Sequence, residues 1–313
     1  MSSNDISVII PTYNCAQFIC RAIDSVLFQE VNAKIIVVDD ASTDATPSIL
    51  ERYASNPHIT IIRNSRNIKL GASRNIGLNH AVSKFVFFLD SDDWLPRGAL
   101  GRLLQVAKDG CADVVASGVL LVDENGNQTS YYSYDFECTK CEDSLDRFSC
   151  YELTAPAWAK LYRLRFIEEH ELRFAEPYWH EDIIFTAQVA KYSKKYISIS
   201  DYLYYYYSNL NSVTKSHPTL LHLESYFFVY NELKKFVSTL ALEHIGNDVL
   251  YRRLFHNYGT AEFMPKFERY ASLTTVKRFE SDLFAAAKAV LGINGYALAD
   301  AIYSLYQHKT LHS

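Results

Sequence analysis

Five short apolar runs in the first 116 residues constrain the fold most strongly. They are rich in β-branched residues, and between them apolar residues recur every three or four positions. The predicted strands lie at 6–10, 34–38, 59–62, 85–89 and 112–116. The predicted helices begin near Ile19, run from an N-cap at Thr46 to Tyr53, and cover 71–81 and 100–107. This alternation predicts an α/β fold with a Rossmann-like, mostly parallel sheet that binds ligands at the carboxyl ends of its strands.

The alternation stops after about residue 122. Residues 123–150 are turn-rich, polar and aromatic, so we expect an irregular inserted or capping region there. The aromatic residues of Tyr202–Tyr207 predict a strand, because such side chains favour a pleated, half-buried surface. From Leu220 onward apolar residues recur at helical spacing. We therefore predict a domain over 1–215, with halves at 1–122 and 123–215, and a helical C-terminal appendage over 216–313.

The composition is that of an ordinary globular protein. Of the 313 residues, 49% are hydrophobic and 21% are charged, which suffices for one large domain or two smaller ones. The net charge of −5 gives no indication of a basic face for nucleic acid. No run approaches the ~20 apolar residues of a membrane span, and the N-terminus lacks the pattern of a secretory signal. We expect a cytoplasmic protein, and the amphipathic tail leaves peripheral contact with the inner membrane open.

The predicted strand at 85–89 runs directly into three carboxylates, those of Asp90, Asp92 and Asp93. Oxygen ligands at the end of a strand suit Mg²⁺ or Mn²⁺, which bind phosphates while keeping open coordination positions. A polar turn that closes a buried strand would have the same composition. This segment alone therefore leaves a metal site and a simple turn as alternatives.

Two other predicted strands also end in polar groups. Thr12 and Tyr13 follow the first strand, and Asp39 and Asp40 follow the second. A tyrosine ring can stack on a base, and a carboxylate can accept the imide N–H of uracil, so the three strand ends together suit a nucleoside diphosphate. Taken singly, Tyr13 would equally suit the core, and Asp39-Asp40 would suit a helix-capping turn.

Four ordered motifs resemble family 2 glycosyltransferases, and the similarity extends over about 5–215. The motifs are Ser7–Asn14 (SVIIPTYN), Ile36–Asp44 (IVVDDASTD), Asn67–Asn75 (NIKLGASRN) and Phe88–Asp93 (FLDSDD). The resemblance implies the GT-A fold, a nucleotide-activated sugar as donor, Mg²⁺ or Mn²⁺ as cofactor, and inversion of the anomeric centre.

The resemblance also assigns roles on the donor side. The residues that it implies for the nucleotide sugar are Pro11, Thr12, Tyr13, Asp40, Arg74, Asp90, Ser91 and Asp92. Arg74 lies in a segment where Ser73 replaces the more usual Ala. We expect Asp92 to be the surest metal ligand, with Asp90 and Asp93 sharing the ribose and water-mediated roles.

In the second half of the chain, Glu181-Asp182 begins a predicted helix. Acidic residues at a helix start often only compensate the helix dipole. The resemblance implies instead that Asp182 is the general base and that Glu181 orients the acceptor, so that the sugar is transferred by direct displacement. The expected acceptor-binding residues are Trp158, Lys160, Trp179 and His180. Core packing is the alternative for Trp158, and Ala159 departs from the Asn that is usual beside it.

Other enzyme classes fit less well. A haloacid-dehalogenase-type phosphatase would have Thr or Val where Trp94 stands, and a nicotinamide-dependent dehydrogenase would have a Gly-rich turn after the first strand. We predict a transferase that uses a UDP-sugar, because of Tyr13 and Asp40, and a hydroxyl of a glycan or lipid-linked glycan. The resemblance to the family further implies that the product is a bacterial surface glycan such as lipopolysaccharide, lipooligosaccharide or capsule. A non-UDP donor and a non-catalytic nucleotide-sugar-binding module stay open as alternatives.

Overall fold

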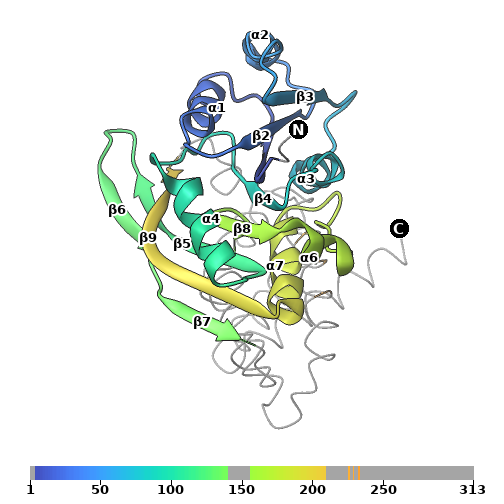
Figure 1. The fold of residues 1–313 in the computed structure, drawn as a ribbon. Helices are drawn as coiled ribbons and strands as arrows, with labels where there is room; N and C mark the ends of the chain where they lie inside the picture. The colour runs from blue at the N-terminus through green and yellow to red at the C-terminus, as the bar shows by residue number, and fades with distance from the viewer. Residues whose placement is uncertain (1–3, 140–155, 209–224, 226–227, 229–231, 233–313) are drawn as a thin grey trace, which may run out of the picture. The chain divides into compact units, whose positions relative to one another are not determined.

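A computed structural model describes residues 4–139 and 156–208, together with Ser225, Phe228 and Glu232 (Figure 1). The chain divides into two compact units. The first comprises 1–177 and 181–215, and the second comprises 178–180 and 216–313. The predicted helical appendage over 216–313 lies outside the described residues, apart from the three single positions.

The described residues of the first unit form one nine-stranded sheet with the order β3-β2-β1-β4-β8-β5-β9-β7, and β6 pairs with β5. The strands are β1 Ile6–Thr12, β2 Ala33–Asp39, β3 Ile59–Arg63, β4 Phe85–Phe88, β5 Val114–Val122, β6 Gln128–Tyr132, β7 Phe136–Thr139, β8 Lys160–Arg163 and β9 Lys195–Tyr207. Strands β1 to β4 are parallel, and β5 is parallel to β9. Strands β6, β7 and β8 are antiparallel to their neighbours. The prediction of a mostly parallel sheet is confirmed.

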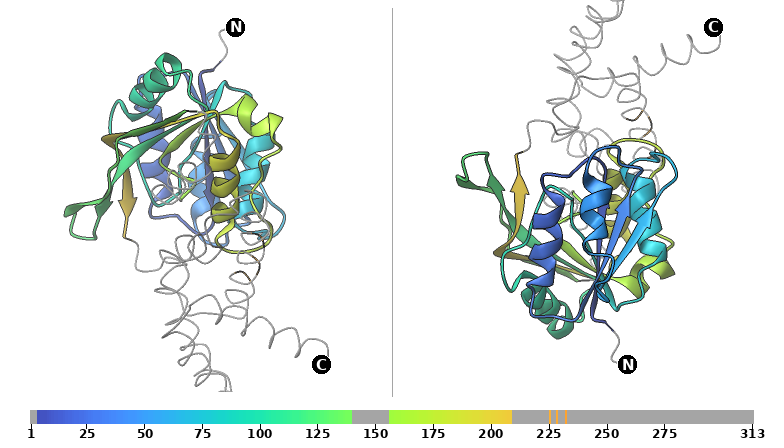
Figure 2. Two further views of the ribbon diagram at one scale, coloured as in Figure 1. Left: turned by 90° about the horizontal axis from the view of Figure 1, so that it is seen from below. Right: turned by 90° about the horizontal axis from the view of Figure 1, so that it is seen from above.

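Helices cover both faces of this sheet, as the edge-on views of Figure 2 show. They are α1 Ile19–Leu27, α2 Thr46–Glu51, α3 Leu70–Asn79, α4 Ala99–Asp109, α6 Leu164–Glu169 and α7 Glu181–Tyr192. Buried residues of α1, α2 and α4 join one apolar cluster, and those of α3, α6 and α7 join the other. The predicted N-cap at Thr46 is wrong by one residue. Ala45 caps α2, while the Thr46 hydroxyl accepts a hydrogen bond from the Cys15 N–H at 2.9 Å.

The expectation of an irregular region at 123–150 is wrong for the part that the structure describes. A turn at Asp123–Asn127 connects β5 to β6, and the Asp123 carboxylate accepts hydrogen bonds from the backbone of Asn125 and Asn127. Gly126 has a φ of +81°, a conformation that glycine adopts without strain. Strand β6 escaped detection because it is exposed and polar, so it lacks the apolar signal of a buried strand. Residues 140–150 lie outside the described residues.

Helix α3 packs unusually close to β1 because residue 77 is glycine. A Cβ atom at Gly77 would lie 2.4 Å from Cγ2 of Ile9, inside van der Waals contact. We expect Gly77→Ala to destabilise the protein by about 1–3 kcal/mol through overpacking, as measured by urea unfolding. Gly101→Ala on α4 is the control. Its Cβ would lie 3.7 Å from Val31, an ordinary contact distance. Because alanine favours a helix over glycine, this variant should raise the free energy of unfolding by up to ~1 kcal/mol.

The predicted strand ends meet at one edge of the sheet. Thr12 at the end of β1 pairs with Asp39 at the end of β2, and Ile9 pairs with Phe88 at the end of β4. The groups that follow these three strands are therefore neighbours, as expected for a parallel sheet. No helix within 4–139 or 156–208 is long and apolar enough to cross a membrane.

Candidate active site

The acidic turn, residues 90–93, follows β4 and presents its three carboxylates differently. The Asp90 side chain is 22% exposed, Asp92 is half-buried, and Asp93 is completely buried. Asp93 Oδ2 accepts a hydrogen bond from the Tyr204 hydroxyl at 2.6 Å, and Oδ1 accepts one from the Tyr207 N–H at 2.8 Å. Burial, together with Asp92 and Asp90, raises the pKa of Asp93 well above its usual range. The structure thus gives Asp93 an anchoring role, and its contact with a metal stays a prediction.

Arg74 joins the acidic turn to the start of α7. Its guanidinium lies 2.6 Å from Asp90 Oδ1 and 2.5 Å from Glu181 Oε1, and its side chain is completely buried. Desolvation alone would lower the pKa of Arg74, but the neighbouring carboxylates of Asp90 and Glu181 reverse the effect and raise it. The cation is therefore permanent, and the two carboxylates compensate it. Direct contact of Arg74 with a donor stays a prediction.

The Glu181-Asp182 pair begins α7, as predicted. The start of α7 lies close to Gly71 of α3. Only glycine fits at residue 71, because a Cβ there would lie 2.3 Å from the Ala175 carbonyl oxygen and 3.0 Å from Glu181. Burial raises the pKa of both carboxyls, while Arg74 opposes the rise in each case. Asp182 is half-buried at this edge. A carboxylate with a raised pKa is a stronger base, which suits proton abstraction from a hydroxyl.

Two of the expected acceptor residues are buried. Lys160 on β8 is 1% exposed and donates a hydrogen bond to the Pro156 carbonyl. Burial lowers the pKa of Lys160 to about 7, and Asp182 opposes that shift. Trp158 is 8% exposed and stacks between Tyr204, at 5.0 Å, and Tyr206, at 5.3 Å between ring centroids. The structure gives both residues packing and electrostatic roles, so their contact with an acceptor stays a prediction.

The other two expected acceptor residues, Trp179 and His180, belong to the second compact unit. Within that unit, the backbone N–H of Trp179 donates a hydrogen bond to the Ser225 hydroxyl at 3.0 Å. Their role toward an acceptor likewise stays a prediction.

Of the residues expected to contact the nucleotide sugar, Tyr13 is 46% exposed, whereas Pro11 and Thr12 are buried. Exposure of the Tyr13 ring favours stacking on a base over the core-packing alternative. Asp40 organises a loop, because its carboxylate accepts hydrogen bonds from the backbone N–H groups of Ile68 and Lys69 at 2.9 and 2.8 Å. These bonds hold the segment that leads into α3 and Arg74.

The carboxylates fit a hard divalent cation. Within the described ranges no group of three or more His, Cys, Asp or Glu side chains is arranged to enclose a metal. Mg²⁺ commonly binds through one or two carboxylates plus substrate phosphates, and Mn²⁺ also accepts such oxygen ligands. Asp92 and Asp90, the two half-buried carboxylates of the acidic turn beside β1, offer such a set.

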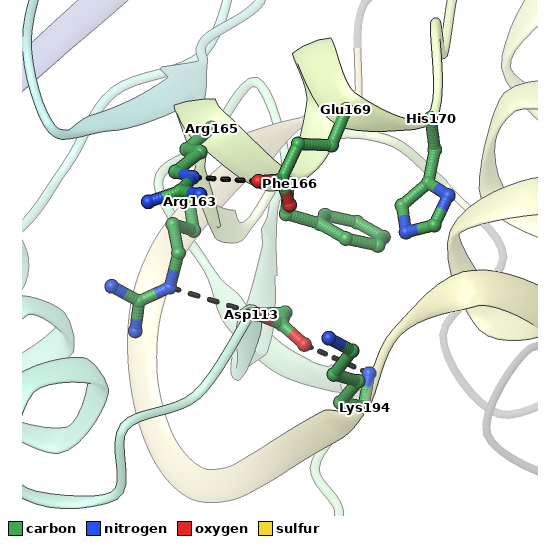
Figure 3. Close-up of a pocket in the computed structure, with 7 residues that line it drawn as sticks. All are labelled: Asp113, Arg163, Arg165, Phe166, Glu169, His170 and Lys194. Carbon is green, nitrogen blue, oxygen red and sulfur yellow. Dashed lines mark hydrogen bonds and ion pairs between the residues drawn. The ribbon is translucent and has the colours of Figure 1, made fainter.

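A cavity of about 330 Å³ lies elsewhere in the first unit, where β5 and β9 begin and β8 ends (Figure 3). Ion pairs line it, including Arg163–Asp113 at 3.6 Å and Arg165–Glu169 at 2.6 Å. It contains none of the predicted site residues. Because open α/β sheets bind ligands at the carboxyl ends of their strands, we assign the chemistry to the other edge.

The fold and the placement of the carboxylates define a protein with the GT-A fold. A solved structure of Staphylococcus aureus TarS, residues 1–349 in complex with UDP-GlcNAc, superposes with a TM-score of 0.70 at 22% identity and covers 94% of this chain and 83% of that one. Residues 7–161 match the family model described as Glycosyl transferase family 2. The chain belongs to this family.

Curated relatives agree with this assignment. The poly(ribitol-phosphate) beta-N-acetylglucosaminyltransferase TarP of Staphylococcus aureus is 30% identical over 243 residues, which is 74% of this chain and 71% of that protein. The GalNAc(5)-diNAcBac-PP-undecaprenol beta-1,3-glucosyltransferase of Campylobacter jejuni is 34% identical over 172 residues, 52% of this chain and 55% of that protein. The chain spans 31% of the length of the glycosyltransferase GlyA of Streptococcus pneumoniae and 96% of that of the putative glycosyltransferase EpsH of Bacillus subtilis.

Two features of the site were not apparent from the sequence. Tyr204 and Arg21 both contact the acidic turn, yet they lie 114 and 71 residues from their partners Asp90 and Asp92. The tyrosine run of Tyr202–Tyr207 predicted the strand, but it did not indicate which ring reaches the turn.

Proposed function

We propose that the protein is an inverting glycosyltransferase. It moves a sugar from a UDP-sugar to a hydroxyl of a glycan or lipid-linked glycan during synthesis of a bacterial surface polysaccharide such as lipopolysaccharide, lipooligosaccharide or capsule. The Arg74 bridge between Asp90 and Glu181 carries this proposal, because it holds a donor-side carboxylate and the base-bearing helix together. The UDP-GlcNAc bound by TarS and the acceptor classes named for TarP and the Campylobacter relative support the donor and acceptor classes.

In this reaction Asp182 removes the proton of the acceptor hydroxyl. The acceptor oxygen then bonds to the anomeric carbon as the bond from that carbon to the UDP oxygen breaks, which inverts the configuration. Glu181, fixed by Arg74, orients the acceptor. A bound Mg²⁺ or Mn²⁺, held by Asp92 with Asp90, would stabilise the negative charge on the departing diphosphate. Asp93 holds the turn from inside the protein.

A panel of nucleotide sugars tests this function. We expect at least one UDP-sugar to raise the thermal unfolding midpoint in the presence of Mn²⁺ and to release UDP slowly to water, and we expect other nucleotide sugars to do neither. Stabilisation without release, even when glycan acceptors are added, would favour a binding module. Failure of every UDP-sugar to bind would contradict the donor assignment.

The pH dependence tests the role of Asp182. Since a base must be ionised, kcat/KM should fall as the pH drops through the raised pKa of Asp182, above the ordinary value of 3.8. Lys160 lowers that pKa by its positive charge. We therefore expect Lys160→Met to move the acid limb of the profile to higher pH. Lys195→Met removes an outlying lysine paired with Glu137 and should leave the limb in place. An unmoved limb in Lys160→Met would contradict the assignment.

A further inference from the structure

One tyrosine hydroxyl touches both ends of the acidic turn. Tyr204 on β9 is completely buried, and its hydroxyl donates a hydrogen bond to Asp93 Oδ2 at 2.6 Å. The same oxygen accepts a hydrogen bond from the Asp90 N–H at 3.3 Å. The two residues that flank Ser91 and Asp92 are therefore held by one atom.

The ring that carries this hydroxyl is itself fixed. Its centroid lies 5.0 Å from that of Trp158, with 18° between the ring planes, and 6.3 Å from that of Phe87. Such close aromatic packing leaves the ring one position. Trp158 therefore acts indirectly, by fixing Tyr204.

Arg21 on α1 holds the middle of the turn. Its guanidinium donates a hydrogen bond to the Asp92 carbonyl oxygen at 2.7 Å. The same group lies 3.7 Å from the centroid of the Trp94 ring, a close cation–π contact. Trp94 in turn exchanges two backbone hydrogen bonds with Tyr205 on β9, at 3.3 and 3.0 Å.

We propose that Tyr204 and Arg21 are positioning residues that fix the acidic turn in the one conformation in which Asp92 and Asp90 meet a divalent cation and the diphosphate. The inference rests on the proposed function of this turn. Groups that hold metal ligands from behind contribute strongly to affinity, because a ligand that must be ordered on binding loses conformational freedom. Residues from α1 and β9, far apart in the sequence, here act on the same short turn.

Calorimetric titration of Mn²⁺ into the full chain, with UDP present, tests the inference. We expect Tyr204→Phe to weaken Mn²⁺ binding by about 10-fold or more and to leave the weaker, metal-free binding of UDP unchanged. The matched control is Tyr202→Phe. It removes a hydroxyl from the same strand, but Tyr202 is 40% exposed, and its hydroxyl donates a hydrogen bond to Ser130 and not to the acidic turn. This control should bind Mn²⁺ like the wild type.

Arg21→Met provides a second variant, because Tyr204→Phe leaves a buried carboxylate with one hydrogen bond fewer and could unfold the protein. It too should weaken Mn²⁺ binding by about 10-fold. If Tyr204→Phe does not fold, Arg21→Met decides alone.

The outcomes separate the inference from the proposed function. If Mn²⁺ does not change the affinity of the wild type for UDP, or if Asp92→Asn binds UDP and Mn²⁺ as the wild type does, the proposed function and the inference are both contradicted. If Mn²⁺ strengthens UDP binding to the wild type, and the folded Tyr204→Phe and Arg21→Met variants bind Mn²⁺ as tightly as the wild type, the inference alone is overturned.

Discussion

Asp182→Asn is expected to lower kcat by about 10²–10⁴-fold, the contribution typical of a general base. Asparagine keeps the volume of the side chain but cannot take a proton from the acceptor hydroxyl. Binding of the UDP-sugar should stay nearly unchanged, because the proposed donor contacts come from the ends of β1, β2 and β4 and not from α7. Single-turnover rates and equilibrium binding of the donor, measured on the same preparation, separate the two effects.

The controls for this prediction come from the same chain. Asp201→Asn replaces an exposed carboxylate that pairs with Arg102, and it should retain wild-type turnover. Glu181→Gln removes the acid that Arg74 holds, and it should reduce turnover less than Asp182→Asn. Near-native turnover in Asp182→Asn, with a large loss in Glu181→Gln, would transfer the role of base to Glu181.

Sequence patterns predicted the part of the fold that depends on local periodicity. The runs that became β1, β2, β4 and β5 are apolar because those strands are mostly buried, and the edge strand β3 is half-buried. Parallel pairing brings the polar ends of β1, β2 and β4 together. The neighbouring positions of Thr12, Asp39 and the acidic turn follow from that pairing alone. The convergence of these groups could therefore be predicted before any coordinates.

The parts that could not be predicted depend on long-range contacts. In the sequence Asp93 is not distinguished from the other acids of its run. Its hydrogen bond with Tyr204, 111 residues later in the chain, shows that it faces inward. Lys160 is expected to bind an acceptor, and its sequence context does not indicate that the packing of β8 between β4 and β5 buries it. Strand β6 is polar because four of its five residues are exposed to water. Local composition carries no information on any of these three placements.

Arg74→Met is expected to lower the free energy of unfolding by about 3–5 kcal/mol, as for other buried ion pairs that lose one partner. Methionine fills much of the same space but leaves Asp90 and Glu181 without the cation that compensates their charge. Urea unfolding measures the change. Arg97→Met is the matched control, because its partner Glu30 is exposed as well, and it should cost less than about 1 kcal/mol. Equal stability of the two variants would contradict a structural role for the bridge.

A double variant shows whether the bridge also serves catalysis. Arg74→Met combined with Glu181→Gln removes one of the two uncompensated carboxylates, so it should recover part of the lost stability. Turnover should not recover, because the double variant lacks the side-chain bridge from Asp90 on the acidic turn to the helix that bears Asp182. Partly recovered stability, with turnover below that of Glu181→Gln alone, would show that Arg74 contributes to the reaction beyond charge compensation. Recovery of both together would limit Arg74 to charge compensation, and the geometry of the site would then depend on the backbone alone.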